Sequence, residues 1–387
     1  MSKFARLLAL LAATVALAAG AASSAAAAPG MAVGFFDDAQ TLYGDPAVTY
    51  PLLKDLKAQV TRVSLYWGFG PLAAAKTRPA DPTNPADPAY DWAAYDRAVH
   101  YANAYGLKVM FSIWGTPDWA NGARGARVAP SNPTDLQNFA YAAAKRYSGT
   151  YLGPDHRLIT PVRLWLAWNE PNSPAFLLPQ FVKRNGKWVV QSAIDYARIC
   201  NAVYGGVHLT AYAGEKVACG GTSPRGNNSP SSIRASVSPL AFVRAVAKTG
   251  RVSFDAWAHH PYYGKSSEEP GKEPPRPSSG AATTAVTLGN INSLISEVTR
   301  LFGQKRIWIT EYGYQTEPPD SQFGVSWATQ AKYLKASYAI ARANPRVDMF
   351  IWFLLRDEPM LDGWQSGVMD ATGKRKPSYA TFRALPR

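Results

Sequence analysis

Two glutamates, each at the end of an apolar, strand-like run, are the residues best placed to do chemistry. Residues 164–168 lead to Glu170, and residues 307–310 lead to Glu311. A parallel strand that is buried on both faces reads as a continuous apolar run, and the carboxyl ends of such strands carry the active site of an α/β barrel. Two carboxyl groups brought together there would form the acid and nucleophile pair that hydrolyses glycosidic bonds.

The motifs around these glutamates resemble those of a known group of enzymes. The turn Asn169-Glu170-Pro171 follows the fourth expected strand, and Glu311 stands alone after the seventh. In both respects the chain resembles clan A of the retaining glycoside hydrolases, and within it the family 39 and family 5 types. The likeness extends over nearly the whole mature chain. It implies that Glu170 is the general acid and base and that Glu311 is the nucleophile.

Alternating apolar and amphipathic segments predict the fold. Apolar runs rich in β-branched and aromatic residues indicate strands, and helical patterns separate them, which is typical of repeated βα units. We expect eight strands, at residues 31–36, 60–67, 107–114, 162–168, 216–220, 254–259, 306–310 and 349–354. We expect helices at residues 91–105, 135–147, 194–207, 288–302, 327–343 and 377–385. The prediction is therefore a (β/α)8 TIM barrel in a single domain.

The first 28 residues read as a secretory signal peptide. Lys3 and Arg6 precede an apolar run over residues 7–17, and an alanine-rich stretch ends at Ala28. This run is shorter than the roughly 20 residues that span a membrane, although an uncleaved anchor is the alternative. We therefore expect a secreted protein with no membrane span after cleavage, its catalytic barrel covering residues 29–387. The Pro/Ser/Gly-rich residues 266–280 are expected to form a long loop within it.

Charge and cysteine content limit the partners. The sequence has 41 basic and 27 acidic residues, a formal charge of +14. This excess would favour anionic walls or polysaccharides, or it is simply a diffusely basic surface. No dense basic cluster is interleaved with aromatic residues, so we expect no nucleic-acid partner. Cys200 and Cys219 are compatible with one disulfide in an exported protein, or with two buried thiols.

Two residues are expected to keep Glu311 ionised. They are Arg62 on the second strand and Tyr262 after the sixth, both at positions that the clan uses in this way. Glu170 should instead have a raised pKa, because it lies among apolar neighbours and near the anionic Glu311. A protonated Glu170 and an ionised Glu311 are the two states that the chemistry requires.

Further polar residues are candidates for binding sugar hydroxyls. The resemblance implies that Asn169 donates to the sugar 2-hydroxyl, although Asn also suits a turn. His260 and Tyr262 match the His-x-Tyr that the clan carries after the sixth strand, with His259 as an additional structural histidine. Asp38 could bind hydroxyls at the remote end of a sugar, or begin a helix.

Several tryptophans fall at or just after the ends of expected strands. They are Trp67, Trp114, Trp119, Trp168 and Trp352. Such rings could stack on apolar sugar faces, or they could be packing residues, because indoles are large and commonly buried. The resemblance favours Trp352, since the clan places a tryptophan of the eighth strand beneath the first sugar. It also implies a cis peptide bond after Trp352.

The sequence lacks the motifs that metal-dependent enzymes and serine hydrolases require. The five histidines form no metal-binding motif, and the nucleophile elbow Gly-x-Ser-x-Gly of serine hydrolases is absent. We therefore expect no metal and no cofactor, and a β-linked carbohydrate as substrate. The alternative is a catalytically silent barrel that binds wall polysaccharide. The sequence leaves open which sugar is cleaved, where the chain is cut, whether water or another sugar accepts the glycosyl group, and the oligomeric state.

Overall fold

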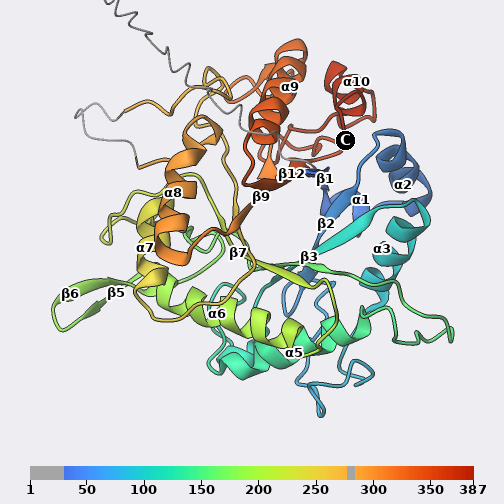
Figure 1. The fold of residues 1–387 in the computed structure, drawn as a ribbon, viewed down its shortest axis with the longest axis vertical. Helices are drawn as coiled ribbons and strands as arrows, with labels where there is room; N and C mark the ends of the chain where they lie inside the picture. The colour runs from blue at the N-terminus through green and yellow to red at the C-terminus, as the bar shows by residue number, and fades with distance from the viewer. Residues whose placement is uncertain (1–29, 277–283) are drawn as a thin grey trace, which may run out of the picture.

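Eight parallel strands close into a barrel. The computed structural model describes residues 30–276 and 284–387, so the expected signal peptide lies outside the described residues. The strands are β1 (Ala32–Phe36), β2 (Val60–Tyr66), β3 (Lys108–Trp114), β4 (Leu164–Ala167), β7 (Lys216–Thr222), β8 (Ala256–His259), β9 (Arg306–Tyr312) and β12 (Val347–Phe353). They pair in the order β1-β12-β9-β8-β7-β4-β3-β2 (Figure 1). The predicted (β/α)8 barrel and its eight strands are confirmed.

Helices surround the barrel (Figure 1). They are α1 (Asp38–Thr41), α2 (Pro46–Asp55), α3 (Ala93–Ala104), α4 (Asp118–Asn121), α5 (Pro133–Arg146), α6 (Gln191–His208), α7 (Pro239–Ala247), α8 (Ile291–Phe302), α9 (Trp327–Ala343) and α10 (Pro377–Arg383), with a 3-10 turn at Leu288–Asn290. The sequence did not predict α2 or α7. Pro51 interrupts the helical pattern of α2, and α7 is only 9 residues long, which is short for a periodic pattern. None of the described helices is long and apolar enough to cross a membrane.

Alternation along the strands separates two hydrophobic cores. Successive side chains of a strand point to opposite faces, so one set fills the barrel and the other packs against the helices. On β2, Val60 belongs to the interior core, whereas Val63 and Leu65 belong to the core beneath the helices. Arg62, at an interior position, is therefore carried up the inside of the barrel toward its carboxyl end.

Insertions follow some of the strands at the carboxyl-terminal end of the barrel. The segment after β4 contains an antiparallel hairpin, β5 (Phe181–Arg184) and β6 (Lys187–Val190), which projects from the barrel (Figure 1). A second small sheet, β10 (Thr316–Glu317) and β11 (Val325–Ser326), lies in the segment after β9. The expected loop at residues 266–280 is irregular where it is described, and part of it lies outside the described residues.

The two cysteines form a disulfide bond. Cys200 of α6 and Cys219 of β7 have Cα atoms 5.8 Å apart and an S–S distance of 2.02 Å. The alternative of two free thiols therefore does not hold. The bond ties a helix of the outer layer to a strand of the barrel.

Candidate active site

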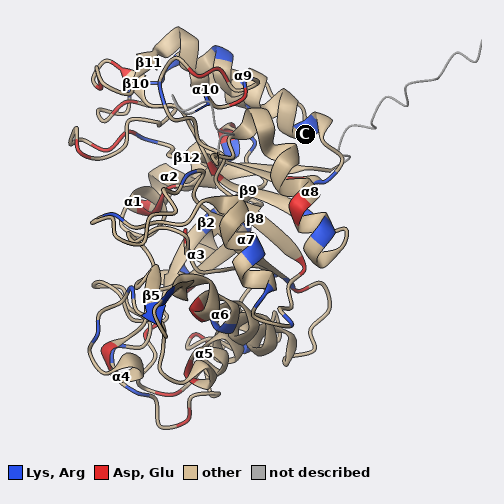
Figure 2. Ribbon diagram, turned by 90° about the vertical axis from the view of Figure 1, so that its left-hand side faces the viewer, with Lys and Arg blue, Asp and Glu red and all other residues tan. Residues whose placement is uncertain are grey.

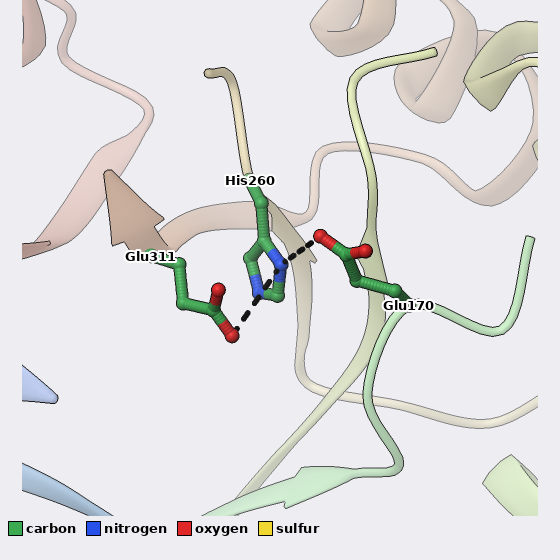
Figure 3. A group of neighbouring side chains, drawn as sticks. All are labelled: Glu170, His260 and Glu311. Carbon is green, nitrogen blue, oxygen red and sulfur yellow. Dashed lines mark hydrogen bonds and ion pairs between the residues drawn. The ribbon is translucent and has the colours of Figure 1, made fainter. Parts of the chain in front are cut away.

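A cavity of about 730 Å³ opens at the carboxyl ends of the strands, and Glu170 and Glu311 line it. His260 lies between the two glutamates (Figure 3). One carboxylate oxygen from each glutamate and one nitrogen of His260 all lie within 4.8 Å of one another. The barrel thus brings together two carboxyl groups that are far apart in the sequence.

Glu311 is held by a cation and a hydroxyl. Arg62 Nη1 donates to Glu311 Oε1 at 2.6 Å, and the Tyr262 hydroxyl donates to Oε2 at 3.1 Å. The Arg62 and Glu311 side chains are 1% and 9% exposed. Burial raises the pKa of Glu311, and the Arg62 charge and both hydrogen bonds oppose this rise. Both predicted partners of Glu311 are therefore in place.

A register irregularity turns Glu311 into the cavity. Between Ile309 and Tyr312, β9 has one more residue than the paired segment of β12 between Phe350 and Trp352. Strict alternation would send Glu311 toward the helices, as it does Ile307 and Ile309. The extra residue re-aims the side chain, as β-bulges beside active sites commonly do.

Glu170 stands in a different environment. Its pKa is raised well above the ordinary value, first by burial and then by the negative charge of Glu311, against a smaller opposing effect of Arg62. No cation contacts Glu170 as closely as Arg62 contacts Glu311 among the described residues. Glu170 is therefore the carboxyl group that keeps its proton. Positive φ angles at Trp168 (70°) and Glu170 (34°) mark a sharp turn that lifts it out of the strand.

The His260 ring lies next to the carboxyl groups of Glu170 and Glu311. Its Nδ1 lies 2.9 Å from Glu170 Oε1, and its Nε2 lies 2.9 Å from Thr310 Oγ1. Burial and the nearby Arg62 hold the pKa of His260 well below its usual value, so the ring is neutral. Protonated Glu170 can then donate to Nδ1 while Nε2–H donates to Thr310. His260 is absent from the cavity lining, so its predicted contact with substrate is wrong; it positions Glu170 instead.

The three grouped residues also offer donor atoms for a metal ion. Glu170, His260 and Glu311 have the right atom types and spacing. However, Arg62 already places a positive charge 2.6 Å from Glu311, and His260 Nδ1 is engaged by Glu170. A metal ion bound there would be repelled by the guanidinium charge of Arg62. The donor set therefore fits an acid and nucleophile pair better than a metal centre.

Asn169 lies beside the pair with a free donor. Its Oδ1 accepts from Arg62 Nη2 at 2.8 Å, which fixes the orientation of the amide. Among the described residues, none accepts a hydrogen bond from the Asn169 amide nitrogen. Asn169 also lines the cavity. This arrangement suits the predicted donation to a sugar hydroxyl.

Asp38 lines the cavity through a carboxyl group that is held by hydrogen bonds. Its Oδ1 accepts from the Ser64 backbone nitrogen at 3.0 Å, and its Oδ2 accepts from the Tyr66 hydroxyl at 2.9 Å. Burial raises its pKa against these hydrogen bonds. Asp38, Ser64 and Tyr66 all line the cavity, so the carboxyl group is held where a sugar hydroxyl could reach it. Asp37 instead caps α1 and accepts from the backbone nitrogens of Leu355 and Arg356.

Of the rim tryptophans, only Trp114 lines the cavity in the described part of the chain. The predictions for Trp67 and Trp352 are wrong. Both are fully buried in the core beneath the helices, and the Trp352 indole nitrogen donates to the Ser366 carbonyl at 2.8 Å. Strand alternation is the reason, because Trp67 is an odd number of residues from the inward-facing Arg62. Trp168 is also fully buried, and the Trp119 nitrogen donates to the Ala75 carbonyl.

The expected cis peptide bond after Trp352 is also wrong. The cis bonds of residues 30–276 and 284–387 all precede prolines, at Pro179, Pro318 and Pro319. The link after Trp352 has the trans form, which a non-proline residue prefers by about 2.5–4 kcal/mol. On the eighth strand the chain therefore departs from the pattern implied by its resemblance.

Several lining residues were not predicted. The interior face of β2 supplies Ser64 and Tyr66, the end of β12 supplies Phe353, and the segment after β12 supplies Glu358 and Trp364. For the β2 residues a signal was available, because they lie two and four positions after Arg62 and must share its face. For Glu358 and Trp364 there was none, because an irregular segment carries no period.

Comparison with known proteins places the fold. No protein-family model matches the sequence, and no curated protein is detectably similar to it. Solved structures do match. A family 39 glycoside hydrolase from the gut symbiont Bacteroides cellulosilyticus WH2 superimposes with a TM-score of 0.62 at 18% identity, over 91% of this chain and 62% of that one. A glucosidase from Croceicoccus marinus gives 0.63 at 15% identity, over 91% and 66%.

The chain shares its barrel fold with these glycoside hydrolases. A structure from a study of two fungal β-1,4-galactanases matches with a TM-score of 0.56 at 15% identity, over 92% of this chain and 99% of that one. The chain thus spans about three-fifths of the family 39 structure but nearly all of the galactanase. At such low identities the likeness establishes the fold, and the chemistry must be argued from the site itself.

Proposed function

We propose that the protein is a secreted, retaining β-glycosidase that hydrolyses β-linked oligo- or polysaccharides, with Glu170 as acid and base and Glu311 as nucleophile. One observation carries the proposal: oxygens of the two carboxyl groups approach within 4.8 Å in a cavity. Retaining glycosidases separate their carboxyl groups by about 5–5.5 Å, and inverting ones by about 6.5–9.5 Å to admit a water molecule. The close approach supports retention.

The first step forms a glycosyl-enzyme. An oxygen of ionised Glu311 attacks the anomeric carbon, the glycosidic C–O bond breaks, and the departing oxygen takes the proton of Glu170. Burial and the charge of Glu311 keep that proton on Glu170 until it is needed. Asn169 can donate to the sugar 2-hydroxyl, a bond that strengthens as positive charge develops on the ring.

The second step releases the sugar. Glu170, now ionised, removes a proton from a water molecule whose oxygen attacks the anomeric carbon, and the bond to Glu311 breaks. Arg62 and Tyr262 stabilise the carboxylate that leaves, because they donate to its two oxygens. Both glutamates return to their starting states, and the chemistry calls for no metal or cofactor.

Export rests on the sequence of residues 1–28, whose charged start, apolar run and alanine-rich end are typical of a signal peptide. The disulfide is consistent with an oxidising compartment. On the face seen in Figure 2, Lys and Arg are spread over several helices and loops. This distribution supports a soluble carbohydrate-active enzyme more than a protein directed to nucleic acid.

The test is a screen of aryl β-glycosides and of plant and microbial polysaccharides, followed by nuclear magnetic resonance of the first anomer released. We expect turnover, with the β-anomer appearing first. An α-anomer released first would mean inversion and would overturn the mechanism. Binding of a polysaccharide without turnover of any glycoside would instead support the silent, wall-binding barrel.

A further inference from the structure

A second cavity, of about 480 Å³, opens beside the catalytic one. The two cavities share part of their walls, formed by Tyr262, Tyr263, Gly264 and Trp364. The remaining lining of the second cavity comes from the segments after β9 and β12, namely Gln315, Asp320, Gln322, Phe323, Leu361, Asp362 and Gly363. A chain that fills the catalytic cavity could therefore continue into the second one.

Hydrogen bonds hold the walls of this second cavity in place. The Tyr263 hydroxyl accepts from the Gln315 backbone nitrogen at 2.9 Å and donates to the Phe323 carbonyl at 3.2 Å, which ties the segment after β8 to the segment after β9. The Tyr263 ring stacks on Tyr314 at 4.0 Å. A cavity that is formed before binding spares the ligand the cost of ordering it.

Two aromatic rings remain uncovered at this cavity. Trp364 packs against Tyr262 and Phe353, each at 5.6 Å, yet is 41% exposed. Phe323 is 42% exposed. Exposed rings of this size are costly to leave in water and offer flat apolar surfaces. Trp364 lines both cavities, and Phe323 lines only the second.

Polar groups beside these rings are also without partners. Among residues 30–276 and 284–387, none forms a hydrogen bond or ion pair with the side chain of Gln322 or Asp362. Asp320 is already used within its own loop, where its Oδ1 accepts from the backbone nitrogens of Gln322 and Phe323. The lining contains two aspartates and no Lys or Arg. An anionic ligand would meet only like charge there, in spite of the basic charge of the whole chain.

We propose that the second cavity is a subsite for an uncharged sugar unit, further along the same chain whose bond is cleaved between Glu170 and Glu311. Rings that face apolar sugar surfaces and free amide and carboxylate groups that meet hydroxyls are the chemistry that binds a neutral saccharide. This inference rests on the proposed function. The preferred substrate is then an oligosaccharide or polysaccharide, and not the glycoside of a single sugar.

Phe323→Ala tests the subsite without touching the catalytic cavity. The kcat/KM of wild type should rise along a series of neutral β-linked oligosaccharides, from the disaccharide upward, once the chain reaches the second cavity. In the variant this gain in kcat/KM should be about tenfold smaller. Turnover of an aryl monoglycoside should stay at the wild-type value. Trp188→Ala, which removes a ring 51% exposed on the distant hairpin, is the matched control and should change neither value.

Binding to an inactive variant separates this inference from the proposed function. Glu311→Gln, with and without Phe323→Ala, is titrated by calorimetry with the same oligosaccharides and with oligogalacturonides. We expect affinity to grow with length only while Phe323 is present, and uronic acid units to bind weakly unless Asp362→Asn removes a charge. Equal length dependence with and without Phe323 would overturn the subsite while leaving the glycosidase proposal intact. Length-dependent binding without turnover of any glycoside would support the subsite and overturn the glycosidase proposal.

Discussion

Glu170 and Glu311 carry the same functional group, so any difference in their chemistry comes from their neighbours. Arg62 and Tyr262 donate to Glu311, which favours its ionised form. Glu170 is buried beside that negative charge and a neutral His260, which favours its protonated form. The two environments push the pKa values apart, which is how one pair of carboxyl groups supplies both an acid and a nucleophile.

The separate roles can be tested by removing each glutamate. Glu311→Ala should abolish turnover of natural substrates, because no glycosyl-enzyme can form. Glu170→Ala should cut kcat/KM by about 10²–10⁴-fold on substrates that need a proton and spare the first step on a dinitrophenyl glycoside. Added azide should then yield the β-glycosyl azide from Glu170→Ala and the α-azide from Glu311→Ala. Reversed anomers would mean that the roles are exchanged.

Arg62 should set the acid limb of the pH profile. It opposes the rise in the pKa of Glu311 that burial causes, so its loss raises that pKa further. The nucleophile must be ionised, and activity is lost as pH falls through its pKa. In Arg62→Met the low-pH limb of kcat/KM should therefore move to higher pH, and in Arg62→Lys, which keeps the charge, it should move less. An unmoved limb in Arg62→Met would contradict this account of Glu311.

At the scale of elements, a buried ion pair fastens the segment after β12, which carries Glu358 and Trp364. Lys376 Nζ lies 2.7 Å from Asp357 Oδ2 and donates to Thr316 Oγ1 at 2.8 Å. The side chains of Lys376 and Asp357 are 0% and 2% exposed. Burial lowers the pKa of Lys376 and raises the pKa of Asp357 to about 6. The pair links this segment to β10 at the rim.

Breaking that pair should cost more than removing it. Lys376→Met leaves Asp357 buried without its cation and should lower the free energy of unfolding by about 3–5 kcal/mol. In the double variant Lys376→Met with Asp357→Leu no unpaired charge remains, so the loss should be smaller. Urea denaturation measures both. If the loss of unfolding free energy in the double variant equals the sum of the losses in Lys376→Met and in Asp357→Leu, the two residues are not coupled.

At the scale of the whole molecule, the disulfide is a link between the layers of the barrel. Cys200 and Cys219 are 19 residues apart in the sequence, and a closed loop of that length corresponds to about 3 kcal/mol of stabilisation on the chain-entropy model. Cys200→Ser with Cys219→Ser should lower the free energy of unfolding by about that amount. Activity of the folded enzyme should be unchanged, since neither cysteine lines the catalytic cavity. Wild type with added reductant should match the double variant.

The sequence by itself determined the barrel and the identity of the reacting pair. Strands that are buried on both faces must be long apolar runs, and chemistry at the carboxyl ends of such strands needs groups directly after them, so Glu170 and Glu311 stood out. The position of Arg62 could also be predicted, and so could those of Ser64 and Tyr66, because residues at even spacing on one strand share a face. The same rule would have excluded Trp67 from the cavity.

Tertiary structure alone decided the rest of the site. The extra residue of β9 turns Glu311 inward, and the left-handed residues at Trp168 and Glu170 lift the acid from its strand; both depend on pairing with neighbouring strands, which no local pattern encodes. The second cavity is formed by segments after three strands, and Phe323 and Trp364 both line it because β8, β9 and β12 are neighbours in the barrel. Irregular backbone has no period, so the residues that shape this part of the substrate site become visible only when the chain is folded.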